Sequence, residues 1–352
     1  MSVTTKPAPA VAATRRGGLE RVLQLLARLW RDNASTLPTL AAVVIFVGMI
    51  IYGETAYGRI VQYSTLSNLL INNTHLVIIA VGMTMVILSG GIDLSVGAVL
   101  AFSSVSGVLL ANAGWHPLLV VIAMVGFGTL FGLTSGVLIQ YFNVQPFIAT
   151  LAMMFLARGL ASILSTEPER LADDSLIREL GATLKIIDGP RVNDLMVTPG
   201  VGIAFVVVVA AVFLLHRTRL GRTIYAMGRS ADSAVLMGLP VRRTRLAIYM
   251  ISGSLSGLAA VVFTSRLGIG QNITGLGWEL DAIAATVIGG TLLMGGSGYV
   301  LGSVVGALVL GLMNVLITRD GGIRPETTTI ITGAILLVFV LLQRAVTARQ
   351  RE

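Results

Sequence analysis

Few residues of this largely apolar sequence could do chemistry, and Asp93 is the most conspicuous of them. It lies in the run SGGIDLS, with Ser89 and Ser95 beside it. A carboxylate inside an apolar stretch is costly and is often functional. A carboxylate that follows two glycines can also accept hydrogen bonds from the first turn of the next helix. We favour this capping role for Asp93 and keep the lining of a pathway or gate as the alternative.

Other polar side chains also interrupt the apolar stretches. Asn72 and Asn73 open one such stretch and suit either a polar pathway or the membrane interface. Glu279 and Asp281 follow two glycines, as acids in the first turn of a helix do, whereas Asn314 suits either an interhelical hydrogen bond or a pathway. The candidates for a substrate pathway or gate are therefore Asn72, Asn73, Ser89, Asp93, Ser95, Glu279, Asp281 and Asn314.

Motifs for energy conversion and catalysis are absent from the sequence. The phosphate-binding pattern G-x-x-x-x-G-K-[ST] does not occur, and neither lysine, Lys6 or Lys185, follows a glycine. The absence of cysteine excludes disulfides and thiol catalysis, and His75, His116 and His216 lack the spacing of metal ligands. We expect no catalytic residue, metal site or cofactor in this chain. If ATP drives its function, another polypeptide must bind ATP and magnesium.

The composition indicates that lipid covers much of the surface. Of the 352 residues, 55% are hydrophobic and only 12% are charged, whereas soluble domains carry about 25% charged residues. Arginines beside apolar runs explain the net charge of +8 by the membrane orientation rule rather than by a nucleic-acid partner. Gly126, Gly128 and Gly132 lie inside an apolar run and indicate helix packing, not a dinucleotide loop. The predicted fold is an all-α, polytopic membrane protein.

Apolar segments of suitable length predict about ten transmembrane helices. The nearly uncharged stretches 71–112 and 282–317 are each too long for one upright helix, so each should contain two crossings. Glycine pairs at 90–91 and 295–296 mark the expected turns. The expected spans are roughly 38–56, 71–89, 93–112, 117–139, 145–164, 197–215, 246–265, 278–295, 298–317 and 328–343.

The charged segments predict the orientation. Segment 1–37, loop 216–245 and tail 344–352 are rich in arginine and should be cytoplasmic, whereas the acidic loop 165–196 should face the outside. Ten spans within a transmembrane domain at 38–343, with both termini cytoplasmic, place every one of these segments on its required side. We therefore expect a multi-pass protein of the inner membrane.

The N-terminal segment is expected to contain an interfacial helix rather than a cleavable signal peptide. Its first apolar run begins late, and no small-residue cleavage pattern follows. An apolar helical face flanked by arginines is typical of a helix lying on the anionic inner leaflet, and a basic flank that only sets topology is the alternative. The face consists of Leu19, Val22, Leu23, Leu26 and Trp30.

A short internal repeat relates LSGGIDLSVGAV at 88–99 to LMGGSGYVLGSV at 293–304. A genuine repeat would make the protein two related halves of about five helices, with a site at their interface. A chance match in a chain rich in glycine and valine is the alternative. Because Gly298 stands opposite Asp93, the two halves would differ in chemistry.

Loop 216–245 predicts a short helix that docks on a partner protein. Ser230 can cap this helix, and Gly238 and Pro240 should end it. Its exposed apolar residues would enter a groove of the partner, and a basic tether that only sets topology is the alternative. The candidate coupling residues are Ser230, Ala231, Asp232, Val235, Leu236, Met237, Gly238, Pro240, Arg242 and Arg243.

Four ordered blocks, between about residues 60 and 343, resemble permease subunits of the ribose, xylose, arabinose and galactofuranose ABC importers. Among these, the chain is most similar to a galactofuranose permease. The blocks are GMTMVILSGGIDLSVGAVLAF at 82–102, QPFIATLAMMFLARG at 145–159, HRTRLGRTIYAMGRSADSAVLMGLPV at 216–241 and ELDAIAATVIGGTLLMGGSGYVLGSVVGAL at 279–308.

The resemblance implies a permease that carries a monosaccharide, a pentose or a galactofuranose-like sugar, across a bacterial inner membrane. It implies three partners: a second permease, identical or paralogous, a cytoplasmic ABC ATPase dimer that binds ATP and magnesium, and a periplasmic sugar-binding protein. It also implies that residues 228–243 contact the ATPase, although Ser230-Ala231-Asp232 stands near the place of the Glu-Ala-Ala of the broader importer class. The alternatives are an ion-coupled secondary transporter and a member of this family that imports a non-sugar ligand.

Overall fold

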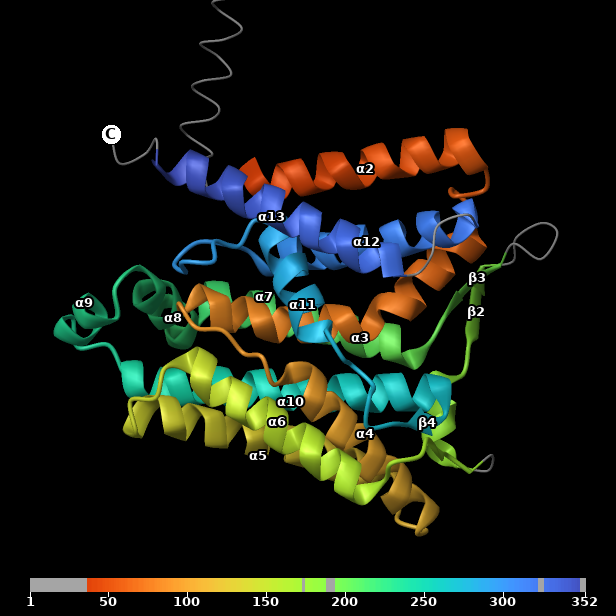
Figure 1. Ribbon diagram of the computed structural model, residues 1–352, viewed down its shortest axis with the longest axis horizontal. Helices are drawn as coiled ribbons and strands as arrows, with labels where there is room; N and C mark the ends of the chain where they lie inside the picture. The colour runs from red at the N-terminus through yellow and green to blue at the C-terminus, as the bar shows by residue number, and fades with distance from the viewer. Residues whose placement is uncertain (1–36, 173–174, 188–193, 322–325, 349–352) are drawn as a thin grey trace, which may run out of the picture.

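A computed structural model describes residues 37–172, 175–187, 194–321 and 326–348, which are mostly helical (Figure 1). The predicted interfacial helix lies outside these residues. The helices are α2 (Leu37–Tyr57), α3 (Tyr63–Leu88), α4 (Val96–Asn112), α5 (Pro117–Tyr141), α6 (Pro146–Leu164), α7 (Pro199–Arg217), α8 (Arg219–Arg229), α9 (Ala231–Leu236), α10 (Val241–Leu267), α11 (Trp278–Ile288), α12 (Val300–Asp320) and α13 (Glu326–Ala348). The short elements are β1 (Glu169–Arg170), the 3-10 helix η1 (Leu176–Gly181), β2 (Leu184–Ile187), β3 (Leu195–Val197) and β4 (Ile269–Gly270).

Seven helices of the described residues are long and apolar enough to cross a membrane, which confirms a polytopic, helical membrane protein. They are α2, α3, α5, α6, α7, α10 and α12. Helix α4 has 17 residues and α11 has 11, so they measure about 25 Å and 16 Å against a hydrocarbon core of about 30 Å. The count of ten crossings stays a prediction.

The helical path is broken at both glycine pairs, so the predicted span 278–295 ends too late. Helix α4 begins only at Val96, and α11 ends already at Ile288. We call residues 89–95 the first break and residues 289–299 the second break. Gly90 and Gly295 have φ angles of +82° and +85°, which glycine adopts readily and which end a right-handed helix. The predicted turns at these glycines are therefore confirmed.

Both breaks are largely buried within the protein. Asp93 and Ser95 of the first break are buried, and so are Gly290 and Thr291 of the second. Irregular backbone is tolerated at membrane depth only where protein or a water-filled cavity surrounds it. The breaks also meet each other, because the backbone N–H of Gly296 donates to the carbonyl oxygen of Leu88 at 2.9 Å. The two segments of the internal repeat thus each include a helix break that precedes a helix, while the relation between two whole halves stays a prediction.

Helices α5 and α10 pack backbone against backbone through glycines. A Cβ added to Gly128 would overlap the carbonyl oxygen of Gly253, and one added to Gly132 would overlap that of Tyr249. Small residues permit this close approach between membrane helices. The predicted packing role is therefore confirmed for Gly128 and Gly132. It is wrong for Gly126, which has no atom within 4 Å of an added Cβ because it lies on the exposed side of α5.

Helix α3 runs through the centre of the molecule, between α12 and α13 on one side and α5 and α10 on the other (Figure 1). Within the most apolar part of α3, 83% of the residues are buried inside the chain, against 11% for α2. Because α3 has helices on all sides, most of its side chains contact protein. Helix α2 lies at the periphery and leaves its apolar side chains for lipid or for another subunit.

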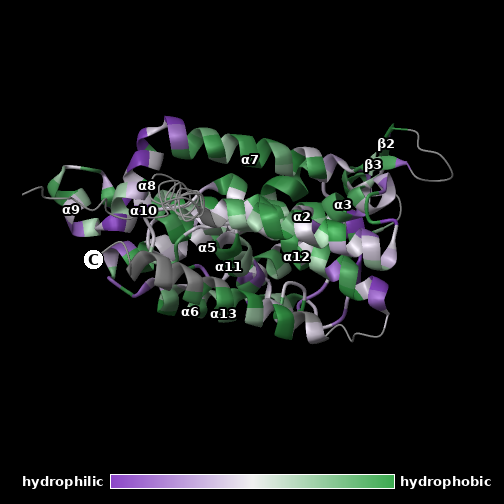
Figure 2. Cartoon of the chain, turned by 90° about the horizontal axis from the view of Figure 1, so that it is seen from above, coloured by the Kyte–Doolittle hydropathy of each residue, from purple (hydrophilic) through white to green (hydrophobic). Residues whose placement is uncertain are grey.

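The two ends of the long axis carry different elements. Helices α8 and α9 project at one end, which we call the α9 end, and the β2–β3 hairpin lies at the other, which we call the hairpin end (Figure 1). Hydrophilic residues gather toward both ends, and hydrophobic residues dominate between them (Figure 2). Loop 216–245 and the described residues of loop 165–196 therefore lie at opposite ends, as the charge pattern predicts. Helix α2 begins and α13 ends toward the α9 end (Figure 1).

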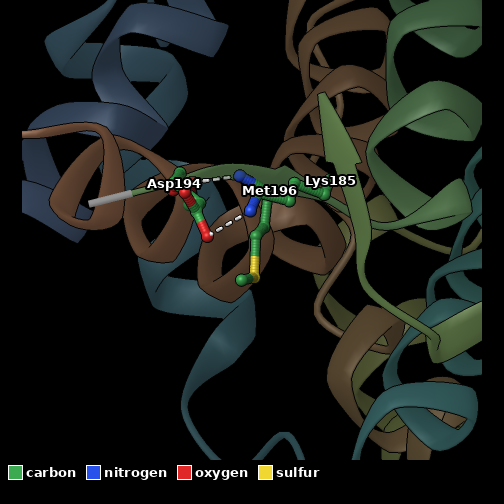
Figure 3. A network of polar contacts seen from close by, with 4 residues as sticks. Lys185, Asp194 and Met196 are labelled. Carbon is green, nitrogen blue, oxygen red and sulfur yellow. Dashed lines mark hydrogen bonds and ion pairs between the residues drawn. The ribbon is translucent and has the colours of Figure 1, made fainter. Parts of the chain in front are cut away.

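The hairpin is attached to the start of α3 by polar contacts (Figure 3). The Lys185 ammonium lies 2.9 Å from the Asp194 carboxylate and joins the two strands. The backbone N–H of Met196 donates to the Ser67 hydroxyl oxygen of α3 at 2.8 Å. These contacts place the N-terminal end of α3 at the hairpin end.

Candidate translocation path and coupling surface

An open, polar cavity of about 550 Å³ lies between α3, α11 and α12. It follows α3 from Thr65, near the hairpin, to Leu76, a distance of about 16 Å along the helix axis. Four of the predicted pathway residues come together here from three helices, together with polar residues that the prediction does not include. The polar lining consists of Thr65, Asn68, Asn72, Asn73, His75, Asp281, Asn314, Thr318 and Arg319.

The missed residues Asn68 and Thr318 carry a signal that the sequence already contains. Asn68 lies one helical turn before Asn72, and Thr318 lies one turn after Asn314, so each pair shares a helix face. A search for polar residues one helical turn before or after each predicted pathway residue therefore identifies both Asn68 and Thr318. Trp278 has no such signal, because it enters the lining only when α11 packs against α3.

The exposed lining residues indicate what lies beside the cavity. Asn68, Asn72 and Asn314 are exposed in this single chain, although each lies on a helix that can span the membrane. Amide groups that face hydrocarbon without partners cost free energy, and intramembrane polar groups therefore face cavities or neighbouring helices. This side of the molecule thus faces water or another protein subunit.

The deep end of the cavity combines an amide with aromatic rings. The Asn73 side-chain nitrogen donates to the carbonyl oxygen of Leu69 at 2.7 Å, and the side chain packs against Gly311, where an added Cβ would overlap it. The His75 ring lies 4.3 Å from the Trp278 ring and 5.4 Å from the Phe263 ring, measured between centroids. These contacts hold His75 and Trp278 in place as one wall of the cavity.

Asp93 lies away from this cavity and is surrounded by donors. It accepts hydrogen bonds from the Ser95 backbone N–H at 3.0 Å and the Ser95 hydroxyl at 2.6 Å. It also accepts one from the hydroxyl of Ser252 on α10 at 2.7 Å. Because Ser95 is the N-cap residue of α4, these bonds support the capping interpretation. Ser89, in the same break, donates to the carbonyl oxygen of Val86 and lines a separate cavity of about 260 Å³.

Glu279 and Asp281 occupy the first turn of α11, as expected for helix N-terminal acids, but their side chains have different neighbours. Asp281 lines the polar cavity. Glu279 instead lies against α4, where a Cβ added to Gly97 would come within 2.9 Å of its Oε2 atom. This buried oxygen has no hydrogen-bond partner among the described residues. The structure therefore places Glu279 outside the lining of the polar cavity.

The predicted short helix of loop 216–245 is confirmed as α9. The Ser230 hydroxyl oxygen accepts a hydrogen bond from the Ser233 backbone N–H at 3.2 Å and so caps the helix. Gly238 follows the helix with a φ angle of +74°, and Pro240 precedes α10. A cap residue at one end and a left-handed glycine at the other are typical helix boundaries.

An apolar surface at the end of α9 lacks a partner within the described residues. Val235, Leu236 and Met237 are exposed, and Leu236 leaves 88% of its surface accessible. Ala234 is buried in a small cluster with Met227 and therefore holds the helix against the protein. Arg242 and Arg243, which are also exposed, begin α10 beside it. Clustered apolar side chains with a charged rim indicate a protein interface.

The comparisons with known proteins agree on one class. The family model described as "Branched-chain amino acid transport system / permease component" matches residues 65–340. The fructose import permease protein FruG of Bifidobacterium longum is 50% identical over 98% of this chain and 98% of its own length. The inner membrane ABC transporter permease protein YjfF of Escherichia coli is 41% identical over 88% of this chain and 93% of its own. The ribose import permease protein RbsC of Escherichia coli is 36% identical over 78% and 84%, respectively.

These matches confirm the predicted family of ABC importer permeases. None of the three names specifies galactofuranose, so the similarity to a galactofuranose permease stays a prediction. No solved structure matches the chain. The relatives are named as transport components and not as enzymes, in agreement with a chain that has no ATP-binding motif. The chain therefore belongs to the family of branched-chain amino acid transport system permease components.

Proposed function

We propose that this chain is the membrane-spanning permease subunit of an ABC importer that carries a monosaccharide across the bacterial inner membrane. The family description names branched-chain amino acids. The relatives that align over most of the chain are instead named as fructose and ribose import permeases. Similarity over nearly the whole length is the better guide to substrate class, and it favours a hexose or pentose.

The polar cavity between α3, α11 and α12 carries this proposal. Amide side chains such as Asn72 and Asn314 offer both donors and acceptors, which match the hydroxyl groups of a sugar. The Trp278 ring in the same wall can cover the apolar face of a sugar ring. The cavity reaches about 16 Å from Thr65 along α3, roughly half of a hydrocarbon core of about 30 Å. We therefore interpret it as an entry vestibule that is closed toward the α9 end.

The same proposal assigns sides and partners. The arginine-rich α9 end faces the cytoplasm together with both termini, and the hairpin end faces the periplasm. The apolar surface of Val235, Leu236 and Met237 docks into a cytoplasmic ATPase dimer, which binds ATP and magnesium. A second permease, identical or paralogous, covers the exposed side of the cavity, and a periplasmic sugar-binding protein delivers the substrate.

An ion-coupled secondary transporter is the second candidate, and Asp281 is the observation that favours it. A carboxylate that lines the cavity could carry a proton or bind sodium during transport. Asp281→Asn separates the two functions. An ATP-driven importer should keep its dependence on ATP and its resistance to ionophores in this variant, whereas ion coupling should be lost.

Reconstitution in proteoliposomes tests the proposed function directly. The chain is assembled with the ATPase, the second permease and the binding protein, and uptake of radiolabelled D-fructose and D-ribose is measured with and without ATP. We expect accumulation against a gradient only in the complete assembly with ATP. Accumulation of either sugar by the chain alone would refute the proposal.

A triple variant tests the docking surface within this assembly. Leu236→Asp combined with Arg242→Glu and Arg243→Glu should abolish co-purification of the ATPase and ATP-driven uptake. Leu276→Asp is the matched control, because Leu276 is also highly exposed, at 75%, but belongs to the loop before α11. Normal ATPase binding by the triple variant would show that α9 is not the docking element.

A further inference from the structure

Helix α8, which leads into α9, rests on the point where the two helix breaks meet. The hydrogen bond from Gly296 N–H to the Leu88 carbonyl oxygen joins the second break to the end of α3. A Cβ added to Gly228 of α8 would overlap both of these bonded atoms and lie 2.9 Å from the Cα atom of Gly296. The backbone of α8 is therefore in direct contact with the last residue of α3, immediately before the first break, and with the second break.

A second contact connects α8 to the second break. The Tyr225 hydroxyl donates to the carbonyl oxygen of Gly298 at 2.8 Å. Burial, with a smaller contribution from Tyr299, raises the pKa of Tyr225 to about 12, so the hydroxyl keeps its proton at physiological pH. His216, at the end of α7, stacks on Tyr299 with the ring planes 11° apart. The second break is thus contacted by both α8 and α7.

The breaks lead to the helices that line the cavity. The first break follows α3, and the second break joins α11 to α12. Of the described helices, α3, α11 and α12 line the polar cavity, whereas α10, which directly follows α9 in the chain, does not. A movement that enters through α8 therefore reaches, through the two breaks, all three helices that line the cavity.

We propose that α8 transmits the movement of the docked ATPase to the cavity by displacing both helix breaks together, with Gly228 and Tyr225 as the positioning residues. This inference rests on the proposed function as an ATP-driven permease. Long side chains at the contact could change rotamer and absorb a displacement of α8. A backbone-to-backbone contact has no rotamer to change, so a displacement of α8 must move Leu88 and Gly296.

Coupling measurements on the assembled transporter test this proposal. The readout is the number of D-fructose or D-ribose molecules taken up for each ATP hydrolysed, in proteoliposomes that contain all subunits. In Gly228→Ala and in Tyr225→Phe we expect this ratio to fall by about fivefold or more, the lower range of typical coupling between sites. ATP hydrolysis and co-purification of the ATPase should persist in Tyr225→Phe, because α9 is unchanged.

Two control variants make the same chemical changes elsewhere. Gly126→Ala adds a methyl group to a helix where nothing lies within 4 Å, and Tyr141→Phe removes an exposed hydroxyl. Both should keep the wild-type ratio. An unchanged ratio in Tyr225→Phe and Gly228→Ala would overturn the proposal. If Gly228→Ala fails to assemble, Tyr225→Phe decides the question alone.

A distance measurement tests the same proposal without relying on transport. Because the chain has no cysteine, spin labels can be placed at Arg222→Cys on α8, outside the docking surface, and at Met294→Cys in the second break, two exposed positions. Their separation should stay the same between the nucleotide-free and ATP-bound assemblies, and it should become nucleotide-dependent in Gly228→Ala. A separation that changes with ATP in the otherwise wild-type chain would overturn the proposal. If the wild-type assembly takes up neither sugar, the proposed function fails, and this distance still tests the connection.

Discussion

Replacing Gly128 by alanine should destabilise the protein, because it forces α5 away from α10. An added Cβ would overlap the carbonyl oxygen of Gly253 and lie 2.9 Å from the backbone nitrogen of Gly257. Ordinary contact begins at 3.4 Å, so the nitrogen contact alone would require the two backbones to separate by about 0.5 Å, and the overlap with the Gly253 oxygen requires more. Inserting a methyl group into a tightly packed contact costs about 1–3 kcal/mol.

Gly126→Ala provides the matched control, two residues away in the same helix. An added Cβ at Gly126 meets no atom within 4 Å, so packing gives no penalty there. Alanine is also preferred over glycine in a helix by roughly 1 kcal/mol. The two variants make the same chemical change and should therefore have opposite effects on stability.

The assay is the free energy of unfolding in mixed detergent micelles, followed by circular dichroism and by the fluorescence of the native tryptophans. We expect Gly128→Ala to lower the free energy of unfolding by about 1–3 kcal/mol and Gly126→Ala to leave it unchanged or raise it slightly. A free energy of unfolding that stays at the wild-type value in both variants would refute the close backbone packing of α5 and α10. Equal destabilisation would show that glycine serves these helices by conformational freedom and not by close approach.

Three further predictions concern docking, capping and the cavity. Leu236→Ala should weaken binding of the ATPase by about tenfold or more, since burying a leucine is worth roughly 1.5–3 kcal/mol. Leu276→Ala should leave this affinity unchanged. Binding kinetics of the ATPase to the permease in nanodiscs measure both. Asp93→Asn should retain ATP-driven uptake, because an amide oxygen can still accept hydrogen bonds. Asp93→Leu should lower the free energy of unfolding by at least about 1–3 kcal/mol, because the Ser95 and Ser252 groups that donate to Asp93 lose their acceptor. Loss of uptake in a stable Asp93→Asn protein would contradict the capping role. Asn72→Leu and Asn314→Leu should reduce sugar uptake but not ATPase binding, and unchanged uptake in both would remove the cavity from the translocation path.

Some of this architecture could be predicted because its causes are local in the chain. Whether a segment can enter a membrane depends on the hydropathy of about 20 consecutive residues, so most expected spans coincide with helices. A cap at Ser230 and a left-handed turn at Gly90 depend on the chemistry of one residue and its neighbours. These features are also the ones that the structure confirms: the membrane helices, the broken helix after Leu88 and the short helix α9.

Other features depend on how the helices are rotated and placed against one another. Hydropathy does not distinguish Gly126 from Gly128, because the difference is which side of α5 meets α10. The expected span at 278–295 is helical only to Ile288, since the second break that follows becomes tolerable when surrounding protein buries it. Local sequence contains no information about that surrounding protein.

The candidate site shows the same division. Polar residues in an apolar helix can be recognised in the sequence, and Asn72, Asp281 and Asn314 were recognised in this way. Their meeting in one cavity, the separation of Glu279 from them and the contact of Gly228 with both breaks require three or more helices to be packed together. Packing of side chains from distant segments decides such contacts, so they follow from the tertiary structure and not from any local stretch of the chain.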